Sequence, residues 1–435
     1  MSFLGMRGTD DWVTDQRPMN WRQQILYIEP NGMAPLTAML SMMGEERVDD
    51  PEFYWWEYLV GHVTGAVAQI WTLPNLTVAY VAGGAAGDTL YLQVTAAVAG
   101  LIRIGHQLLL RDASDHTVDV NAKVTAVDIN GGNSVIAVKL LEADDNSTIV
   151  PANNLSDCDN LMVIGNINPE GGQMPDPVLW DPTKIYNKCQ IFRTSLSITR
   201  TAKRTRLRTG DEYTKQKKEC LMQHSMEMEM AFLWSILTDN IGTNSKPERT
   251  MRGLIPFIRQ YAPGNVDDFR YNATYSGTTW IQETGGILWL NTMLEQMFRY
   301  GSTEKFAFCG SGALLGLQRL AMAHSQLNIT VGQGAYGIKV LEWITPFGTL
   351  YLKTHPLFSY DAVTRNMVVV FEPKKIKYRY IDDTTFYKDG EASHPGRGGG
   401  RLDATDEEFL TECSLEMTNP YGCGLLTGFN SDSLV

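Results

Sequence analysis

The sequence predicts an α+β fold built on one strand followed by one long helix, with a smaller all-β domain earlier in the chain. Residues 189–199 alternate in character at every second position and are rich in β-branched and aromatic side chains, which is typical of a half-buried strand. Residues 211–238 contain neither proline nor glycine and can form a helix about 40 Å long. Residues 75–165 consist of short alternating segments separated by glycine and asparagine pairs, which indicates an all-β domain.

The composition is that of an ordinary globular protein of several domains. The 435 residues are 43% hydrophobic and 20% charged. The first 20 residues are polar and charged, so we expect no signal peptide. The longest apolar run, residues 95–110, contains Arg103 and His106 and is too short for an expected membrane span. We therefore expect a soluble protein made in a cytosol-like compartment. The six cysteines show no Cys-x-x-Cys spacing and no neighbouring histidines, so we expect reduced, mostly buried thiols.

The net charge of −12 is unevenly distributed. Residues 193–218 hold nine basic and two acidic residues, so this segment is strongly positive while the remainder is strongly negative. An acidic chain argues against a protein that reads DNA sequence, which needs a basic face. We interpret the basic segment as a docking element for an acidic neighbour, such as another copy, with solvated charge and nucleic-acid contact as alternatives. Its connector residues are Arg200, Lys203, Arg204, Arg206 and Arg208.

The chain begins with what we expect to be an extended arm. Residues 1–50 are polar, contain three prolines and offer one short helix at residues 36–43. Phe53, Trp55 and Trp56 then follow a pair of aspartates. We interpret this stretch as an aromatic strand laid on a neighbour, because a platform for stacking bases would have basic flanks.

The all-β domain has a clear hairpin at its centre. Residues 118–129 alternate, Asn130 and Gly131 give a strong turn signal, and residues 134–141 return as a second strand. Two further short strands are predicted at residues 89–95 and 161–164.

The central strand and helix have definite faces. On the strand, Ile191, Arg193, Ser195 and Ser197 lie on one face, opposite Phe192, Thr194, Leu196 and Ile198. Thr209 or Asp211 is expected to cap the helix. The spacing of its apolar residues predicts one stripe, formed by Met222, Met226, Met230, Leu233 and Leu237.

The rest of the chain alternates between helices and strands after a loop-rich segment at residues 243–279. Helices are expected at residues 286–300, closed by Gly301, and at residues 312–323, capped by Ser311. Strands are expected at residues 305–308, 338–343, 349–353, 367–371, 374–380 and 409–417.

Motifs that carry chemistry are incomplete. Residues 332–337 match G-x-G-x-x-G but precede a predicted strand, so we expect a mobile loop and no dinucleotide site. Residues 308–312 form a strand-to-helix turn that lacks a phosphate-loop lysine, and residues 396–401 are expected to be a flexible loop, with an anion contact as the alternative. The acidic clusters at residues 45–52 and 403–408 are interpreted as solvated faces. We expect no enzymatic activity, no cofactor and no metal.

Several segments, taken in order, resemble a known family. Gln190–Thr199 reads Q-I-F-R-T-S-x-S-x-T, a long helix follows, and residues 249–254 read R-x-x-x-G-L. Shorter matches are F-x-W at residue 53, F-G-x-L at residue 347 and T-E-x-x-L-E at residue 411. In this order the segments resemble the major capsid proteins of tailed bacteriophages, which have the HK97-like fold.

The resemblance implies a division of the chain. The family motifs do not cover the all-β domain, so we expect it to be an insertion. The implied parts are an N-terminal arm (1–52), an extended-loop strand (53–74), an inserted β domain (75–165), a linker and extended-loop return strand (166–210), a spine helix with peripheral domain (211–275), an axial domain (276–365) and C-terminal strands of the peripheral domain (366–435).

The resemblance also implies a function and partners. It implies a major capsid protein that self-assembles, as hexamers and pentamers, into an icosahedral virion shell around double-stranded phage DNA, without sequence-specific DNA binding or a membrane. Assembly would occur in the host cytoplasm with a portal protein, and scaffold, protease or decoration proteins are further candidates. The alternatives are a soluble oligomeric protein that binds a ligand such as carbohydrate, and an encapsulin-like cargo shell. The residues expected to dock between subunits are Arg200, Lys203, Arg204, Arg206, Arg208, Phe53, Trp55 and Trp56.

Overall fold

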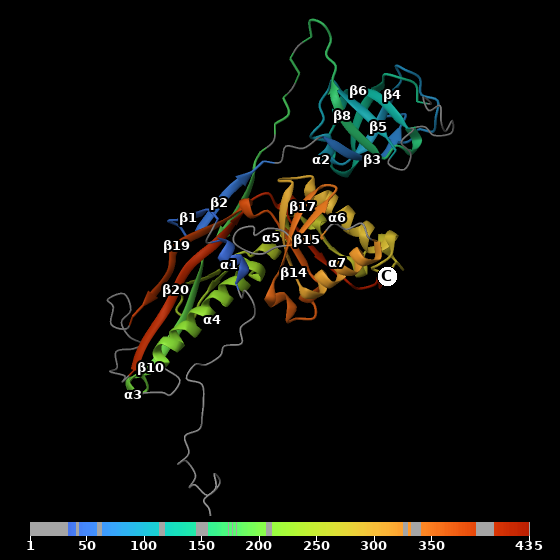
Figure 1. Cartoon of the computed structure of the whole chain (residues 1–435). Coiled ribbons are helices and arrows are strands. Elements are labelled where there is room, and N and C mark those ends of the chain that lie inside the picture. The colour runs from blue at the N-terminus through green and yellow to red at the C-terminus, as the bar shows by residue number, and fades with distance from the viewer. Residues whose placement is uncertain are drawn as a thin grey trace, which may run out of the picture. The chain divides into compact units, whose positions relative to one another are not determined.

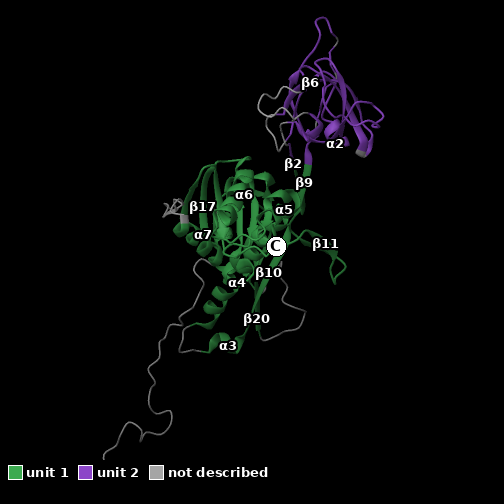
Figure 2. Ribbon diagram, turned by 90° about the vertical axis from the view of Figure 1, so that its right-hand side faces the viewer, with its two compact units in different colours: residues 1–55, 184–435 green, residues 56–183 purple. Residues whose placement is uncertain are grey.

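The computed structural model describes residues 34–434 except 41–42, 59–62, 113–117, 145–154, 173, 176, 180, 206–210, 325–328, 332–340 and 389–403. The chain divides into two compact units, shown in different colours in Figure 2. Unit 1 comprises residues 1–55 and 184–435, and unit 2 comprises residues 56–183. Each unit has a hydrophobic core of its own.

The first layer of unit 1 is a four-stranded sheet with a long helix along one face (Figure 1). The longest pairing joins β10 to β20 antiparallel, from Gln190 opposite Cys413 to Thr199 opposite Ala404. The alternation predicted for β10 is confirmed, because its even-numbered residues from Phe192 to Ile198 are buried and the odd-numbered ones are exposed. The strands, in sheet order, are β1 (Glu45–Arg47), β19 (Ile376–Tyr387), β20 (Ala404–Met417) and β10 (Gln190–Thr199).

The long helix, α4 (Glu212–Trp234), is shorter than predicted. Its start is as expected, since the Asp211 side chain accepts a hydrogen bond from the backbone N–H of Thr214 at 3.2 Å. It ends at Trp234 because Ser235 adopts an extended conformation and the next residues form a hairpin. That hairpin pairs β11 (Thr238–Ile241) with β12 (Pro247–Thr250).

The apolar stripe predicted on α4 is confirmed only at Leu233, which is fully buried. Met230 is 43% exposed, whereas the buried face repeats every four residues through Cys220, His224, Met228 and Phe232. Two polar residues, His224 and Glu229, are buried on this helix with hydrogen-bond partners. A pattern that counts only apolar residues therefore misplaced most of the buried face of this helix.

The second layer of unit 1 is a mixed seven-stranded sheet with helices on both faces. Residues Ala307 and Cys309 of its central strand share a core with α6 (Leu288–Phe298) and α7 (Ser311–His324). Phe306 and Phe308 face the opposite core, which contains α5 (Leu254–Tyr261) and α4. In sheet order the strands are β13 (Val266–Asp268), β21 (Gly424–Thr427), β18 (Val368–Phe371), β14 (Glu304–Cys309), β17 (Gly348–Thr354), β16 (Leu341–Thr345) and β15 (Ile329–Val331).

Shorter elements complete the secondary structure of the described residues. The predicted arm helix is present as α1 (Pro35–Leu40), and the aromatic stretch forms β2 (Glu52–Glu57), which pairs with β9 (Thr183–Lys188). Part of the basic connector is helical, as α3 (Arg200–Arg204). Single turns lie at Gly131–Asn133, Leu155–Asp157, Pro263–Asn265, Phe269–Tyr271, Ala273–Tyr275, Pro356–Ser359, Thr364–Asn366, Pro373–Lys375 and Pro420–Gly422, and a π-helical segment, Glu283–Ile287, precedes α6.

Unit 2 is a closed six-stranded barrel. Its strands run in the order β3 (Thr64–Trp71), β4 (Thr89–Val94), β7 (Ser134–Leu140), β6 (Asp119–Asp128), β5 (His106–Arg111) and β8 (Asn160–Asn166), and a short helix, α2 (Ala96–Ala99), accompanies them. The hairpin predicted at Asn130 and Gly131 joins β6 to β7. One expectation is corrected: Thr64–Trp71 was placed in an extended-loop strand, but it pairs with β4 and β8 and so closes the barrel.

The fold is thus α+β, as predicted. In unit 1 the long strand, the long helix and the later mixed sheet follow one another in the order that the HK97-like resemblance implies. The cysteine prediction is also confirmed, because all six side chains are buried thiols.

Candidate assembly site

Two sets of residues in unit 1 bear on assembly: buried contacts that hold the strand–helix layer together, and exposed groups that could meet another copy. The buried contacts begin at His224 on α4. Its Nδ1 lies 2.9 Å from Thr194 Oγ1 on β10, and its Nε2 lies 2.8 Å from Thr411 Oγ1 on β20. Burial lowers the pKa of His224, against a smaller opposite effect of Glu227, so the neutral ring is favoured. One imidazole therefore joins the helix to both long strands.

A second buried polar group, Glu229, joins segments far apart in the sequence. Its carboxylate is fully buried. It accepts hydrogen bonds from Leu36 N at 2.8 Å, Thr37 N at 2.7 Å and Thr37 Oγ1 at 2.7 Å, all on α1. His355 Nε2, just after β17, lies 2.8 Å from the same carboxylate. Glu229 thus attaches the arm helix to α4, and sequence reasoning missed it because the apolar neighbours of Glu229 suggested nothing but a core.

The sheet face opposite α4 carries ion pairs between strands. Arg193 of β10 binds Glu408 of β20 through two nitrogens, with Nη2 2.6 Å from Oε1 and Nε 2.9 Å from Oε2. Farther along the sheet, Arg379 of β19 contacts Glu46 of β1 at 2.6 Å and Glu416 of β20. These pairs fix the register of all four strands.

The interpretation of residues 403–408 as a solvated acidic face is wrong for two of them. Glu407 and Glu408 are both buried. Glu408 binds Arg193, and Glu407 accepts a hydrogen bond from Tyr213 of α4 at 2.5 Å, which raises the pKa of Tyr213 to about 12. Burial is tolerated because each carboxylate has a donor across the strand or the helix.

The basic connector lies where β10 ends. Thr199 caps α3, and the three described basic residues of this helix, Arg200, Lys203 and Arg204, are all exposed. Lys203 Nζ also lies 4.2 Å from the centre of the Tyr213 ring. The two remaining predicted residues, Arg206 and Arg208, lie outside the described residues. We define Arg200, Lys203 and Arg204 as the basic patch.

The aromatic residues that the sequence predicts to dock lie in a different place. The rings of Phe53 and Trp55 stack with centroids 6.1 Å apart, and Trp55 packs against the main core of unit 1, whereas Trp56 is 57% exposed. The strand that holds them pairs with β9, at the beginning of β10, while the basic patch follows the end of β10. Ten extended residues span about 33 Å, so the structure does not bring Phe53 and Trp55 together with the basic patch.

The described residues offer little for chemistry. No group of three or more histidine, cysteine or acidic side chains among them could hold a metal ion. Burial raises the pKa of Cys158 and Cys189 to about 12, so neither is an activated nucleophile. Within the same residues, no helix has the length and apolar character that a membrane crossing requires. The glycine-rich loops at residues 332–337 and 396–401 lie outside the described residues.

Comparison with known proteins adds a family. A family model described as the SU10 major capsid protein matches residues 8–430. The major capsid protein of Pseudomonas phage PaMx41 is 26% identical over 429 residues, which cover 93% of this chain and 90% of that protein. Among solved structures, Microbacterium phage Oxtober96 shares 10% identity at a TM-score of 0.43, over 94% of this chain and 96% of that chain. The SrpI encapsulin of Synechococcus elongatus PCC 7942 shares 11% identity at a TM-score of 0.37, over 58% of this chain and 77% of that chain.

Proposed function

This chain belongs to the SU10 major capsid protein family and is a phage major capsid protein, and we propose that its copies assemble as hexamers and pentamers into an icosahedral shell around double-stranded DNA. The observation that carries this proposal is the family match, which runs from residue 8 to residue 430. Symmetry is compatible with closed shells, because contacts between unlike surfaces form rings when their rotation closes, and rings of six and five can tile a closed surface.

The charge distribution supports a specific contact between subunits. The basic patch is exposed at the end of β10, on a chain whose net charge is −12. A cationic end on an anionic body attracts another copy and disfavours wrong orientations, which sets register more than affinity. We therefore assign Arg200, Lys203 and Arg204 to a contact between copies, with Arg206 and Arg208 as further members from the sequence.

Phe53, Trp55 and Trp56 remain candidates for a second contact. Trp56 and Tyr54 are both more than half exposed on β2, and large exposed aromatic side chains are common at protein interfaces. In this proposal β2 and β9 are the two strands of the extended loop, and unit 2 is an insertion at its end.

The further partners follow from the proposed shell. A shell with one entrance for DNA needs a portal protein. Scaffold, protease or decoration proteins are further candidate partners. The acidic chain suits a wall that encloses DNA without holding it, because tight binding of phosphates needs clustered cations. The assembled protein belongs to the virion, and we place its assembly in the host cytoplasm.

Negative-stain electron microscopy of the chain expressed alone, with sedimentation velocity on the same sample, tests the proposal. We expect closed shells, rings or tubes that sediment far faster than the 48.6 kDa subunit. If only a small discrete oligomer is seen, the chain is co-expressed with a candidate scaffold protein from its own phage. A small oligomer under both conditions would contradict self-assembly into a shell.

A further inference from the structure

Arg252 is a buried arginine that has no carboxylate partner among the described residues. It is 6% exposed, and its guanidinium lies 5.7 Å from the centre of the Tyr186 ring on β9 and 5.2 Å from the centre of the Tyr261 ring at the end of α5. Nη1 donates a hydrogen bond to Tyr261 Oη at 2.8 Å. A guanidinium has five N–H groups, so four of them have no protein acceptor in the part of the chain that the structure describes. None of its nitrogens is sealed from solvent.

The backbone of Arg252 is fixed by one buried carboxamide. Asn187 of β9 is 1% exposed, and its Oδ1 accepts a hydrogen bond from Arg252 N at 2.7 Å. Its Nδ2 donates to Arg252 O at 3.0 Å and to Leu415 O of β20 at 2.8 Å. Arg252 is therefore held in one place against two strands, and its guanidinium is presented at a defined position.

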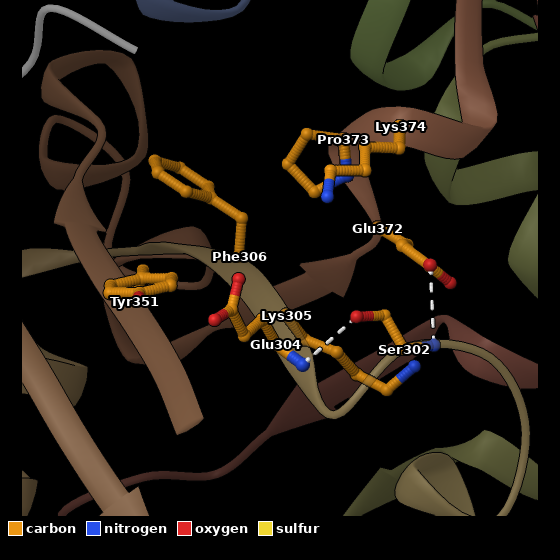
Figure 3. Close-up of a pocket in the computed structure, with 8 residues that line it drawn as sticks. All are labelled: Ser302, Glu304, Lys305, Phe306, Tyr351, Glu372, Pro373 and Lys374. Carbon is orange, nitrogen blue, oxygen red and sulfur yellow. Dashed lines mark hydrogen bonds between the residues drawn. The ribbon is translucent and has the colours of Figure 1, made fainter. Parts of the chain in front are cut away.

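Lys305, another buried cation of unit 1, has its partners within the chain. It is fully buried, and its Nζ donates a hydrogen bond to the carbonyl oxygen of Tyr300 at 3.0 Å. Figure 3 shows Glu372 beside the same small pocket as Lys305. A charge that leaves water is costly unless it is paired. Arg252 is different, because the described part of its own subunit supplies no anion.

A second cation without a carboxylate lies on β9. Alternate residues from Lys184 to Lys188 share one face of this strand, opposite two buried residues. Lys184 Nζ lies 4.1 Å from the centre of the Tyr54 ring, and among the described residues it forms no ion pair. Lys188, in contrast, contacts Asp239 at 2.5 Å and Glu52 at 3.5 Å. The positive charge on this face is thus paired at one end of β9 and unpaired at the other.

These residues form one strip of cations and aromatic rings in unit 1. We define the cation–tyrosine strip as Tyr54, Lys184, Tyr186, Arg252 and Tyr261. It is separate from the basic patch, because β9 leads into the beginning of β10 and the basic patch follows the end of β10. Tyr54 and Tyr186 are both exposed, and exposed tyrosine together with arginine is typical of protein interfaces.

We infer that the cation–tyrosine strip binds carboxylates carried by another copy of this chain. Arg252 binds one carboxylate through paired N–H···O bonds, and the Lys184 ammonium binds a second. Charge complementarity identifies the partner, because the chain has 49 acidic residues against 37 basic ones and each copy therefore carries an excess of carboxylates. The inference rests on the proposed assembly and adds the chemical character of one of its contacts.

Sedimentation velocity of the full-length chain, over a range of concentrations, tests the inference. We expect Arg252→Gln to raise the concentration at which half of the protein is assembled by about tenfold or more, without changing the circular dichroism spectrum of the subunit. Arg252→Lys keeps the charge but not the paired donors, so it should lie between the wild type and Arg252→Gln. Lys184→Glu, at an exposed position, should also weaken assembly, whereas Lys374→Glu, an exposed lysine outside the strip, should not.

A zero-length carbodiimide reagent, which joins an amine to a carboxylate in contact with it, identifies the partner. Treated wild-type assemblies should give a dimer band on a denaturing gel, and a digest of that band should contain Lys184 joined to an aspartate or glutamate. Lys184→Arg keeps the charge but has no reactive amine. It should assemble like the wild type and lose this cross-linked peptide.

Four outcomes would overturn the inference. Wild-type levels of assembly in both Arg252→Gln and Lys184→Glu would do so and would leave the proposed shell standing. Equal loss of assembly in Lys374→Glu would assign the effect to net charge. Binding of double-stranded DNA by single wild-type subunits, lost in Arg252→Gln, would assign the strip to phosphates. A wild-type chain that stays a single subunit and gives no cross-linked dimer would overturn both the inference and the proposed shell. If Arg252→Gln does not fold, Lys184→Glu and the cross-link decide.

Discussion

Glu229 shows how much one buried carboxylate can hold in place. It accepts hydrogen bonds from two backbone N–H groups and one hydroxyl of α1 and contacts His355. We predict that Glu229→Gln lowers the free energy of unfolding by about 2–3 kcal/mol, because the amide presents one acceptor instead of two and directs N–H groups at buried donors. Urea denaturation measures this change.

The same variant should loosen α1 selectively. Hydrogen exchange at Leu36 and Thr37 is expected to accelerate more than exchange in the seven-stranded sheet. Glu219→Ala, at an exposed position of the same helix, is the matched control and should change stability by less than about 0.5 kcal/mol. Equal effects of the two variants would show that Glu229 contributes no more than an ordinary surface residue.

His224 makes stability depend on pH. Its pKa in the folded protein is lowered, so below about pH 6.5 the unfolded chain takes up a proton that the folded chain resists. This contribution to stability is complete above that pH and is lost as the pH falls. We predict that the difference in urea midpoint between wild type and His224→Gln shrinks between pH 7.5 and pH 5. A constant difference across this range would contradict a depressed pKa.

At the scale of elements, the join between α4 and α5 depends on the absence of a side chain at Gly253. A Cβ there would lie 2.8 Å from Ala231 O and 2.9 Å from Phe232 O at the end of α4. Gly253 is the glycine of the R-x-x-x-G-L segment, so the motif has a physical reason: the start of one helix touches the backbone of another. We predict that Gly253→Ala destabilises unit 1 by about 1–3 kcal/mol, measured by thermal unfolding.

Gly264→Ala provides the control for this prediction. No atom lies within 4 Å of the Cβ that the substitution would add, and Gly264 does not adopt a positive φ angle. Its effect should be near neutral or slightly stabilising, because alanine reduces the freedom of the unfolded chain. If Gly253→Ala destabilises the protein no more than Gly264→Ala does, close packing at the helix junction is not the reason that position 253 is glycine.

The sequence predicts elements well where one local rule decides their burial, and poorly where distant partners decide it. β10 alternates because one of its faces is buried and the other is not, and this pattern is visible in ten consecutive residues. The buried face of α4 depends on His224 and Glu229, whose partners Thr411 and Leu36 are 187 and 193 residues away. The place of β3 in the barrel was not predictable for the same reason, since only its pairing with β4 and β8 defines it.

The candidate site was predictable only in part. The basic patch is visible as a run of cations in the sequence, and the structure places its described members on an exposed helix. Nothing local reveals that Glu407 and Glu408 are buried, because their donors Tyr213 and Arg193 come from the first half of the central strand–helix segment. Interfaces also depend on a second copy, which one sequence does not contain.

At the scale of the whole molecule, the basic patch is expected to act on assembly and not on folding. We predict that Arg200→Glu combined with Arg204→Glu leaves the circular dichroism spectrum and thermal unfolding of the subunit unchanged but abolishes shells in electron micrographs. The control variant combines Lys374→Glu with Lys375→Glu. Both lysines are exposed, so this variant changes the net charge by the same amount. Loss of shells in both variants would assign the effect to net charge, and shells in the first variant would contradict the docking role of the patch.

Unit 2 should be separable from unit 1. The strands of the barrel form a closed hydrogen-bonded ring, and they enclose a hydrophobic core of their own. We predict that replacing residues 58–182 with a short Gly-Ser linker leaves unit 1 folded and removes one transition from the calorimetric unfolding profile. Aggregation of the shortened chain, or loss of its cooperative transition, would show that unit 1 requires the barrel.

The pairing of β2 with β9 has an evolutionary consequence. The chain leaves for the barrel after Glu57 and returns at Thr183, and these two strands are hydrogen-bonded neighbours. Both breakpoints of such a module are therefore adjacent in space, although more than a hundred codons separate them. A single recombination event can add, delete or exchange the module as a cassette, and any replacement whose ends lie close together meets the same geometric requirement. Among relatives, large differences in length should therefore concentrate between these two strands.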